Sequence, residues 1–359
     1  MVGGPHPAAA LAILCRRLGC YHGNTILSVN HMHSTPHPFA TLSPARVVAA
    51  IESLGFWLPG EPFALNSYEN RVFLLYDDEG RRWVAKFYRP GRWSDEQIQE
   101  EHDFLDELAA EGVAVAAPWR DDSGRSLHQM EGFRLALFPQ LPGQAPELEN
   151  PAQLFALGEL IGAVHAVGER AEFQHRGRLD LDGMVHEARR RVLTAPWLER
   201  RQRQAYERIS VELQDVLAAH AWAPEKTIRV QGDCHIGNLL GRDDNFALVD
   251  FDDCLMAPAV QDVWMFLTAE HEAEWHMQLS EVLEGYEQHR EFDRRELALI
   301  EPLRTLRLMR HSAWLVARWE DPAFPQAFPW VADAAYWETH IRQLEQQRVA
   351  LTRSSPWLA

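Results

Sequence analysis

The segment that decides the fold runs from Val230 to Leu240, VQGDCHIGNLL, and is followed at residues 248–253 by LVDFDD. Asn238 comes five residues after Asp233, and Asp250 comes twelve residues after Asn238. Apolar residues flank these polar side chains, which is typical of short strands that alternate with turns. Carboxylate and amide oxygens are the ligands that Mg²⁺ prefers. The spacing therefore indicates a metal site built on neighbouring turns.

The same spacing is typical of a kinase catalytic loop. In that loop an Asp accepts the proton of the acceptor hydroxyl, and an Asn five residues later binds a metal ion. An Asp on the next strand turn holds Mg²⁺ against the ATP phosphates. The pattern predicts Asp233 as catalytic base, Asn238 and Asp250 as ligands of Mg²⁺, and ATP as co-substrate, with Asp250 also counted among the catalytic residues. Phosphoryl transfer depends mainly on positioning and charge neutralisation, which these groups supply.

A second signal lies earlier in the chain and is independent of the first. Lys86 interrupts the apolar strand pattern of residues 83–88, WVAKFY, which is the place of the phosphate-binding lysine in kinases. The next predicted helix, capped by Ser94, carries Glu101 on its apolar stripe. A buried Lys and a buried Glu each need a partner. We therefore expect these two residues to pair and to orient the ATP phosphates, the alternative being an edge-strand lysine and an incidental glutamate.

The order of the predicted elements gives the fold class. Strand patterns occur at 71–76, 82–88 and 133–139, and a helix begins at Pro44 with Ser43 as its N-cap, near which order is expected to begin. Beyond Gly143 the pattern is mostly helical, with helices expected from residue 151 and near 182–194, 198–219, 260–288 and 294–320. The prediction is an α+β, two-lobed protein-kinase-like fold, with a small antiparallel-sheet N-lobe and a larger helical C-lobe. Its expected divisions are a disordered extension (1–40), a nucleotide-binding N-lobe (41–142) and a C-lobe with the catalytic loop, metal site and substrate binding (143–359).

Composition excludes some classes of partner. The formal net charge of −17 argues against nucleic acid and anionic membranes. No apolar run approaches the roughly 18 residues that a membrane-spanning helix needs. The four cysteines follow no disulfide or zinc spacing, which fits a reducing cytoplasm. The first 40 residues hold five histidines and no Asp or Glu, so we expect them to be disordered, with a His-rich metal-binding tail as the alternative and Met32 as an alternative start.

Several longer motifs resemble one known family. They are Leu65–Arg71 (LNSYENR), Val84–Pro90 (VAKFYRP), Gly232–His235 (GDCH), Gly237-Asn238, Pro258–Asp262 (PAVQD) and Asp321–Pro325 (DPAFP). From about residue 40 to about residue 345, the sequence resembles the stress response kinase A family, also called RdoA kinases, within the aminoglycoside phosphotransferase and choline kinase-like group. The resemblance implies a cytoplasmic, monomeric Ser/Thr protein kinase linked to envelope or oxidative stress, which acts on protein substrates and also phosphorylates itself.

The resemblance also implies roles for individual residues. Ser67 approaches the ATP phosphates in the loop 66–71, which replaces a Gly-rich loop, and the hinge after Phe138 binds adenine. Asp262 braces the backbone of the catalytic loop. One departure concerns Gln231, because related kinases carry His at this position; an amide can replace part of its bracing role, so the doubt falls on the rigidity of the loop.

Other readings of the sequence stay open. The same fold can phosphorylate a small molecule such as an aminoglycoside, choline or homoserine, because cationic acceptors suit an acidic C-lobe. A non-catalytic ATP-binding scaffold is a second alternative, favoured only by Gln231, and a metal hydrolase built on Asp233, His235 and Asp250 is a third. Smaller questions concern a second Mg²⁺ or a solvated turn at residues 252–253, a structural role for His165, and a lobe cap or peptide-docking surface formed by Trp314, Trp319, Trp330 and the run 322–330.

Overall fold

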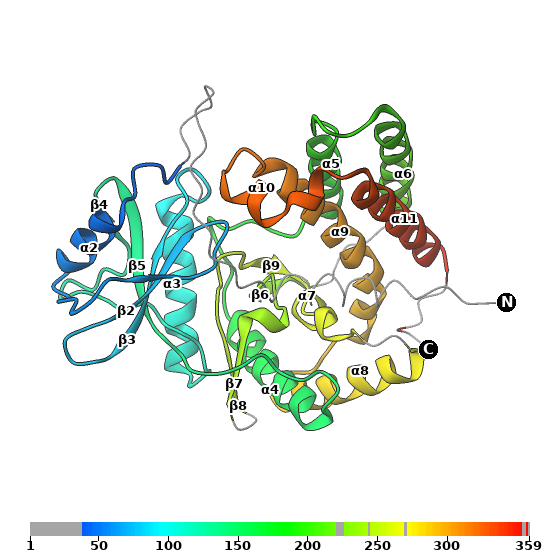
Figure 1. Cartoon of the computed structure of the whole chain (residues 1–359). Coiled ribbons are helices and arrows are strands. Elements are labelled where there is room, and N and C mark those ends of the chain that lie inside the picture. The colour runs from blue at the N-terminus through cyan, green and yellow to red at the C-terminus, as the bar shows by residue number, and fades with distance from the viewer. Residues whose placement is uncertain (1–37, 220–225, 243–244, 269–270, 354–356, 358–359) are drawn as a thin grey trace.

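The strand-rich first part of the chain forms one antiparallel sheet. The computed structural model describes residues 38–219, 226–242, 245–268, 271–353 and 357. The strands have the order β1-β2-β3-β5-β4 and are β1 (Phe63–Ala64), β2 (Arg71–Tyr76), β3 (Arg82–Phe87), β4 (His128–Met130) and β5 (Phe133–Pro139). All pairs are antiparallel, and β2 and β3 form a hairpin. Figure 1 shows this part in blue, cyan and bluish green beside a larger helical part.

Two helices cover the two faces of the sheet. Helix α2 (Pro44–Glu52) is capped by Ser43, and its apolar side packs with one face of β3 and β5. Helix α3 (Asp95–Ala110) has the predicted capping box of Ser94 and Gln97, and it packs on the other face. Phe39 is buried and stacks on Phe133, so the packed core begins a few residues before Ser43. The rest of the predicted disordered extension, residues 1–37, lies outside the described residues.

The remainder of the chain is mostly helical, as predicted. Its helices are α4 (Pro151–Gly168), α5 (Leu181–Val192), α6 (Arg200–Ala219), α7 (Val260–Val263), α8 (Glu272–Tyr286), α9 (Ile300–Ala317), α10 (Ala323–Ala327) and α11 (Ala334–Leu351). Short 3₁₀ turns are η1 (Ile236–Asn238), η2 (Trp264–Phe266), η3 (Arg294–Leu299) and η4 (Pro329–Ala332). One core joins α3 to α4, α7 and α8, and a second lies among α5, α6, α9 and α11. Since the first core spans both parts of the chain, the division at residues 142 and 143 stays a prediction.

Helices α4 and α8 approach each other unusually closely. A Cβ atom added to Gly158 would lie 2.1 Å from the backbone oxygen of Val282, and one added to Gly162 would lie 2.4 Å from that of Tyr286. Only glycine fits such a contact between helix backbones. This packing fixes α4, which carries His165 toward the catalytic loop, as described below.

Two small antiparallel strand pairs carry the motif segments. Strands β6 (Ile228–Val230) and β9 (Leu255–Ala257) form one antiparallel pair, and β7 (Leu239–Arg242) and β8 (Asn245–Leu248) form the other. The catalytic-loop segment therefore leaves β6 and enters β7, and the segment with Asp250 leaves β8 and enters β9. These two strand pairs thus bring the turns predicted from the sequence side by side.

The helix predicted at 260–288 is wrong as one element. It consists of α7, η2 and α8, because Leu267 departs from helical backbone angles and the backbone N–H of Thr268 donates to the side chain of Gln278. The helix predicted at 294–320 likewise begins as the 3₁₀ turn η3 before α9. Over the described ranges, no helix combines the length and the apolar character that crossing a membrane requires.

Candidate active site

Lys86 is the central cation of the site. Strand β3 places its side chain on the face of the sheet that α3 covers, and only 7% of the residue is exposed. Its Nζ lies 3.2 Å from Glu101 Oε1, 3.3 Å from Asp250 Oδ1 and 3.0 Å from Asp252 Oδ1. Burial alone lowers the pKa of Lys86, but these three carboxylates raise it well above its ordinary value. The side chain is therefore an ammonium group that joins the sheet to the Asp250 segment.

Glu101 pairs with Lys86 as predicted, and it has a second partner. Its other oxygen, Oε2, accepts from Arg176 Nη2 at 2.9 Å. Arg176 also donates to the backbone oxygens of Asp252 (2.8 Å) and Cys254 (3.3 Å). A buried carboxylate needs such partners to stay ionised. Arg176 thus fixes Glu101 and the segment after Asp250 in one arrangement.

Gln231 braces the catalytic loop at the position where a His was expected. The side chain is fully buried, its Oε1 accepts from the backbone N–H of Asp233 at 2.8 Å, and its Nε2 donates to the backbone oxygen of Asp250 at 2.6 Å. The amide oxygen of Gln231 thus binds the Asp233 segment, and its amide nitrogen binds the Asp250 segment. The rigidity that the sequence left in doubt is supplied by this side chain.

Asp262 of helix α7 binds the backbone of the same loop. Its carboxylate accepts from the backbone N–H groups of Gln231 (2.7 Å) and Gly232 (2.8 Å). His165 Nε2 lies 3.1 Å from Asp262 Oδ2, and its Nδ1 lies 3.0 Å from the hydroxyl of Tyr286. All three side chains are buried. The bracing role predicted for Asp262 and the structural role predicted for His165 both agree with these contacts.

Asp233 and Asn238 occupy the two ends of the catalytic loop. Asn238 Nδ2 donates to the backbone oxygen of Asp233 at 3.1 Å, and the backbone oxygen of Asn238 accepts from Val249 N at 2.9 Å. The second contact places Asn238 beside Asp250, which has a positive φ of 57°. Such backbone is costly for a residue with a Cβ and recurs at functional sites. The structure therefore brings Asp233, Asn238, Asp250, Lys86 and Glu101 together.

Asp233 has a cationic partner that the sequence did not reveal. Arg307 of α9 donates to Asp233 Oδ1, and His235 Nε2 lies 3.6 Å from Asp233 Oδ2. Burial alone raises the pKa of Asp233, but mainly the charge of Arg307 lowers it to about 2. His235 Nδ1 accepts from Gly237 N at 2.9 Å, a contact within the loop. Asp233 is thus an ionised carboxylate near neutral pH.

Asp252 and Asp253 are engaged in ion pairs. Arg92 donates to Asp252 Oδ2 and, at 2.8 Å, to Asp253 Oδ1. Asp252 is 3% exposed, so the solvated turn considered from the sequence is wrong for this residue. Arg92 follows β3 in the chain, and it ties the sheet part to the Asp250 segment a second time.

The loop that carries Ser67 is attached to the helical part. Glu69 accepts from Trp314 Nε1 and, at 2.8 and 2.9 Å, from the Arg318 guanidinium. The Tyr68 ring packs against Phe324 and Phe328, with centroids 5.6 and 4.8 Å away. Within the described residues Ser67 makes no hydrogen bond with Lys86, Asp233 or Asp250; its backbone oxygen accepts from Arg71 at 3.4 Å. The loop is positioned, but the structure does not join Ser67 itself to the other site residues.

The run 322–330 and the preceding Asp321 also contact the sheet part of the chain, so they do not only cap the helical lobe. Arg89 donates to Asp321 Oδ2 at 3.0 Å and to the backbone oxygen of Glu69 at 3.0 Å. Asp321 and Arg89 belong to two different sequence motifs, and neither motif predicts that the two residues pair. Their pairing, like that of Arg307 with Asp233, joins residues more than 70 positions apart and has no local sequence signal.

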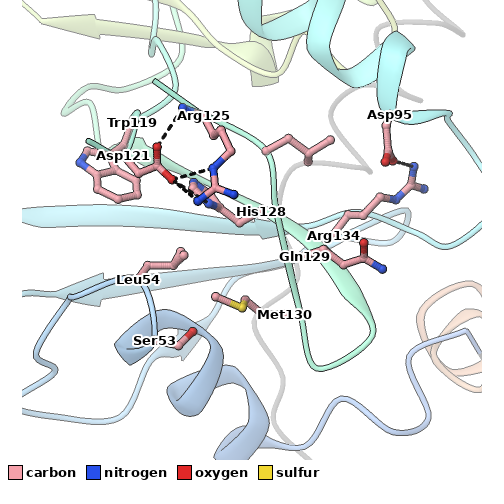
Figure 2. Close-up of a pocket in the computed structure, with 11 residues that line it drawn as sticks. Ser53, Leu54, Asp95, Trp119, Asp121, Arg125, His128, Gln129, Met130 and Arg134 are labelled. Atoms are coloured by element: carbon pink, nitrogen blue, oxygen red, sulfur yellow. Dashed lines mark hydrogen bonds and ion pairs between the residues drawn. The ribbon is translucent and has the colours of Figure 1, made fainter. Parts of the chain in front are cut away.

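A separate cavity of about 440 Å³ lies at the edge strand β4. Its lining includes Trp119, Asp121, His128 and Arg134, and Figure 2 shows the ion pairs of Asp121 with Arg125 and of Arg134 with Asp95 at this place. None of the predicted site residues lines it. The cavity is therefore distinct from the cluster around Lys86.

Comparison with known proteins shows the family of the chain. The phosphotransferase enzyme family matches residues 61–300. Stress response kinase A of Escherichia coli K12 is 41% identical over 323 residues, which cover 89% of this chain and 96% of that protein. The serine/threonine protein kinase RdoA of Salmonella typhimurium is 40% identical over 317 residues, which cover 88% of this chain and 95% of that protein.

Solved structures share the fold at lower identity. An amicoumacin kinase in complex with AMP-PNP, Ca²⁺ and its ligand has a TM-score of 0.67 at 20% identity, over 84% of this chain and 92% of that one. A microcompartment-associated aminopropanol kinase has a TM-score of 0.65 at 17% identity, over 87% and 99%. These likenesses confirm the predicted fold class. The chain belongs to the phosphotransferase enzyme family, within its stress response kinase A members, and is an ATP-dependent kinase.

Proposed function

We propose that the protein transfers the γ-phosphate of ATP to Ser or Thr hydroxyls of proteins, its own among them, with Mg²⁺ as the metal. The observation that carries the proposal is the contact of Lys86 with both Glu101 and Asp250, beside a braced loop with Asp233 and Asn238. Protein kinases need a strand lysine paired with a helix glutamate, and an Asp that holds Mg²⁺ against the phosphates. The protein acceptor is supported by relatives at about 40% identity that are named as stress response and serine/threonine protein kinases.

The residues present fit a divalent metal with ATP. Asn238 donates from its side-chain nitrogen to the Asp233 backbone, so its side-chain oxygen is the atom that would bind the metal, and the Asp250 side chain is 56% exposed. Mg²⁺ is usually held by one or two protein groups, with phosphates and water as the remaining ligands. Asn238 and Asp250 would hold the ion, which would neutralise charge on the phosphates. In the part of the chain that the structure describes, no three His, Cys, Asp or Glu side chains converge as a metal site, so a hydrolase centre of Asp233, His235 and Asp250 has no support.

The residues of the chain divide the reaction among them. Lys86, oriented by Glu101, neutralises phosphate oxygens, and the loop with Ser67 covers the phosphates. Asp233 accepts a hydrogen bond from the acceptor hydroxyl and takes its proton. As the acceptor oxygen bonds to the γ-phosphorus, the bond from that phosphorus to the bridging oxygen breaks, and ADP leaves with that oxygen. Adenine binds at the hinge that follows Phe138, where strand β5 ends at Pro139.

Two alternatives to a protein kinase are a non-catalytic scaffold and a small-molecule kinase. A scaffold without activity was favoured only by Gln231, and the contacts of Gln231 with Asp233 and Asp250 remove that support. A small-molecule acceptor keeps the same catalytic residues and is distinguished only by experiment. We further propose that the protein acts in the cytoplasm as a monomer, without a nucleic-acid or membrane partner.

The test is transfer of labelled γ-phosphate from Mg·ATP to the protein itself and to a generic protein substrate. Asp233→Asn keeps the shape of the base and removes its basicity, and Asp215→Asn, exposed on α6, is the matched control. Label on Ser or Thr that is lost with Asp233→Asn and kept with Asp215→Asn supports the proposal. ATP consumption that depends on a small hydroxyl compound, with no labelled protein, would favour the small-molecule alternative. Absence of Mg·ATP binding would refute the nucleotide site.

A further inference from the structure

One face of helix α9 lies along the reaction site. Arg307, Arg310, His311 and Trp314 follow the i, i+3, i+4, i+7 spacing that puts side chains on the same side of a helix. The neighbouring residues Leu306, Leu308, Met309, Ser312, Ala313 and Leu315 are buried, whereas Arg310 is exposed and the other three members are half-buried. We call these four residues the α9 face.

Both ends of the α9 face touch site segments. At one end Arg307 donates to the carboxylate of Asp233, and at the other Trp314 donates to Glu69 in the loop of Ser67. The two ends are seven residues apart, or roughly 10 Å along the helix. An acceptor hydroxyl must reach Asp233, because the proposed base acts within hydrogen-bond distance. The atoms next to that hydroxyl then lie beside the α9 face.

The charge of this face is opposite to that of the whole protein. The four residues of the face include two arginines, Arg307 and Arg310, and no Asp or Glu, in a chain with a net charge of −17. Arg307 neutralises the carboxylate that would otherwise attract a cationic acceptor, and Arg310 acts on Asp233 as a further positive charge. His311 is neutral near pH 7, because burial lowers its pKa to about 4.

We propose that the α9 face selects an acidic protein segment, with carboxylates within about three residues of the acceptor Ser or Thr. The inference rests on the proposed protein kinase activity. An extended chain advances about 3.3 Å per residue, so roughly 10 Å accommodates about three residues. Carboxylates on that segment complement Arg310, and a polycationic acceptor meets repulsion at the same place. Arg307 acts as a positioning residue, because it orients the base and faces the segment.

The experiment measures kcat/KM for pairs of peptides that carry one Ser and three flanking residues, either Glu or Lys, on its N-terminal or C-terminal side. The wild type and Arg310→Glu are compared, with Arg208→Glu as a control of equal charge change at an exposed position of α6. We expect the wild type to prefer the Glu peptides on one side at least, and the preference to fall about tenfold in Arg310→Glu. The preference should also weaken as salt is added.

The outcomes separate this inference from the proposed function. Peptides that are phosphorylated equally well with Glu or Lys flanks, or a preference that is the same in Arg310→Glu and Arg208→Glu, would overturn the inference and leave the kinase proposal intact. Failure to phosphorylate any peptide or protein would refute the kinase proposal itself.

Arg307 is tested by separating kcat from KM. Arg307→Gln removes the group that donates to the Asp233 carboxylate, so kcat should fall for every peptide while KM changes less, and Arg307→Lys should restore part of kcat. Equal kcat values for the wild type and Arg307→Gln would mean that Arg307 does not orient the base.

Discussion

The side-chain nitrogen of Gln231 lies 2.6 Å from the backbone oxygen of Asp250, while its oxygen accepts from the backbone N–H of Asp233. One side chain therefore sets the distance between the proposed base and the proposed metal ligand. The amide replaces a His expected at this position and explains why the loop can be rigid without it.

The first prediction concerns Gln231→Leu, which removes these bonds at similar size. Each buried polar group left unpaired costs about 1–3 kcal/mol, so kcat should fall about 10- to 100-fold, with a smaller change in the KM for ATP. Gln204→Leu, at an exposed position of α6, is the control. Steady-state kinetics that show equal kcat values for both variants would contradict the bracing role.

The second prediction concerns Gly232, next to the proposed base. Its φ is +90°, and an added Cβ would lie 2.3 Å from the backbone oxygen of Asp253. Gly232→Ala should therefore displace the catalytic loop and abolish most activity, with a loss of stability of about 1–3 kcal/mol. Gly177→Ala is a suitable comparison, because an added Cβ there meets nothing within 4 Å. Equal melting temperatures and rates for the two variants would show that the loop tolerates the change.

The sequence predicts those parts of the site whose residues lie within short segments and are typical of one chemistry. The Asp233, Asn238 and Asp250 spacing and the Lys86–Glu101 pair are set within short segments, and the antiparallel sheet follows from three strand patterns. The structure brings these five residues together, although their roles stay proposals. The short strands β1, β4 and β9 and the helix α11 were not predicted, since two or three residues give no periodicity and α11 carries a weakly segregated apolar pattern.

Other parts of the site depend on distant packing. Arg307 pairs with Asp233, Arg92 with Asp252 and Glu69 with Arg318, each more than 70 residues away, so no window of sequence shows these pairings. The break between α7 and α8 has a similar cause, because Gln278 takes the backbone N–H of Thr268 out of the helix. Apolar periodicity continues across this break, which is why the sequence predicted a single helix.

The third prediction concerns Glu69, which attaches the loop of Ser67 to Trp314 and Arg318. Glu69→Ala should loosen this loop and raise the KM for ATP about tenfold. Charge-assisted hydrogen bonds contribute about 1.5–3 kcal/mol each, and only part of the lost free energy should appear as weaker ATP binding, because the freed loop can still reach the phosphates. The effect on kcat should be smaller. Glu79→Ala, in an exposed ion pair with Arg81, provides the comparison. An unchanged KM for ATP would mean that the attachment does not position the phosphate loop.

The fourth prediction concerns Glu296 in η3, which accepts from Val260 N at 2.9 Å at the start of α7, the helix that carries Asp262. Burial raises the pKa of Glu296 from 4.5 to about 7. Between these values the folded state holds a proton that the unfolded state has lost. The contribution of this group to stability is therefore complete below about pH 4.5 and is lost as pH rises to about 7, by roughly 1 kcal/mol per pH unit.

Glu296→Gln mimics the protonated form at every pH, so it should remove this loss. The melting temperature of the variant should exceed that of the wild type at pH 8, and the difference should shrink toward pH 5. Glu291→Gln, at an exposed position, should show a small and pH-independent difference. Thermal unfolding at the two pH values decides the matter: a gain for Glu296→Gln of equal size at pH 5 and pH 8 would mean that Glu296 is already ionised in the folded protein at pH 5. The backbone N–H of Val260 would then donate to a carboxylate and not to a protonated acid at both pH values.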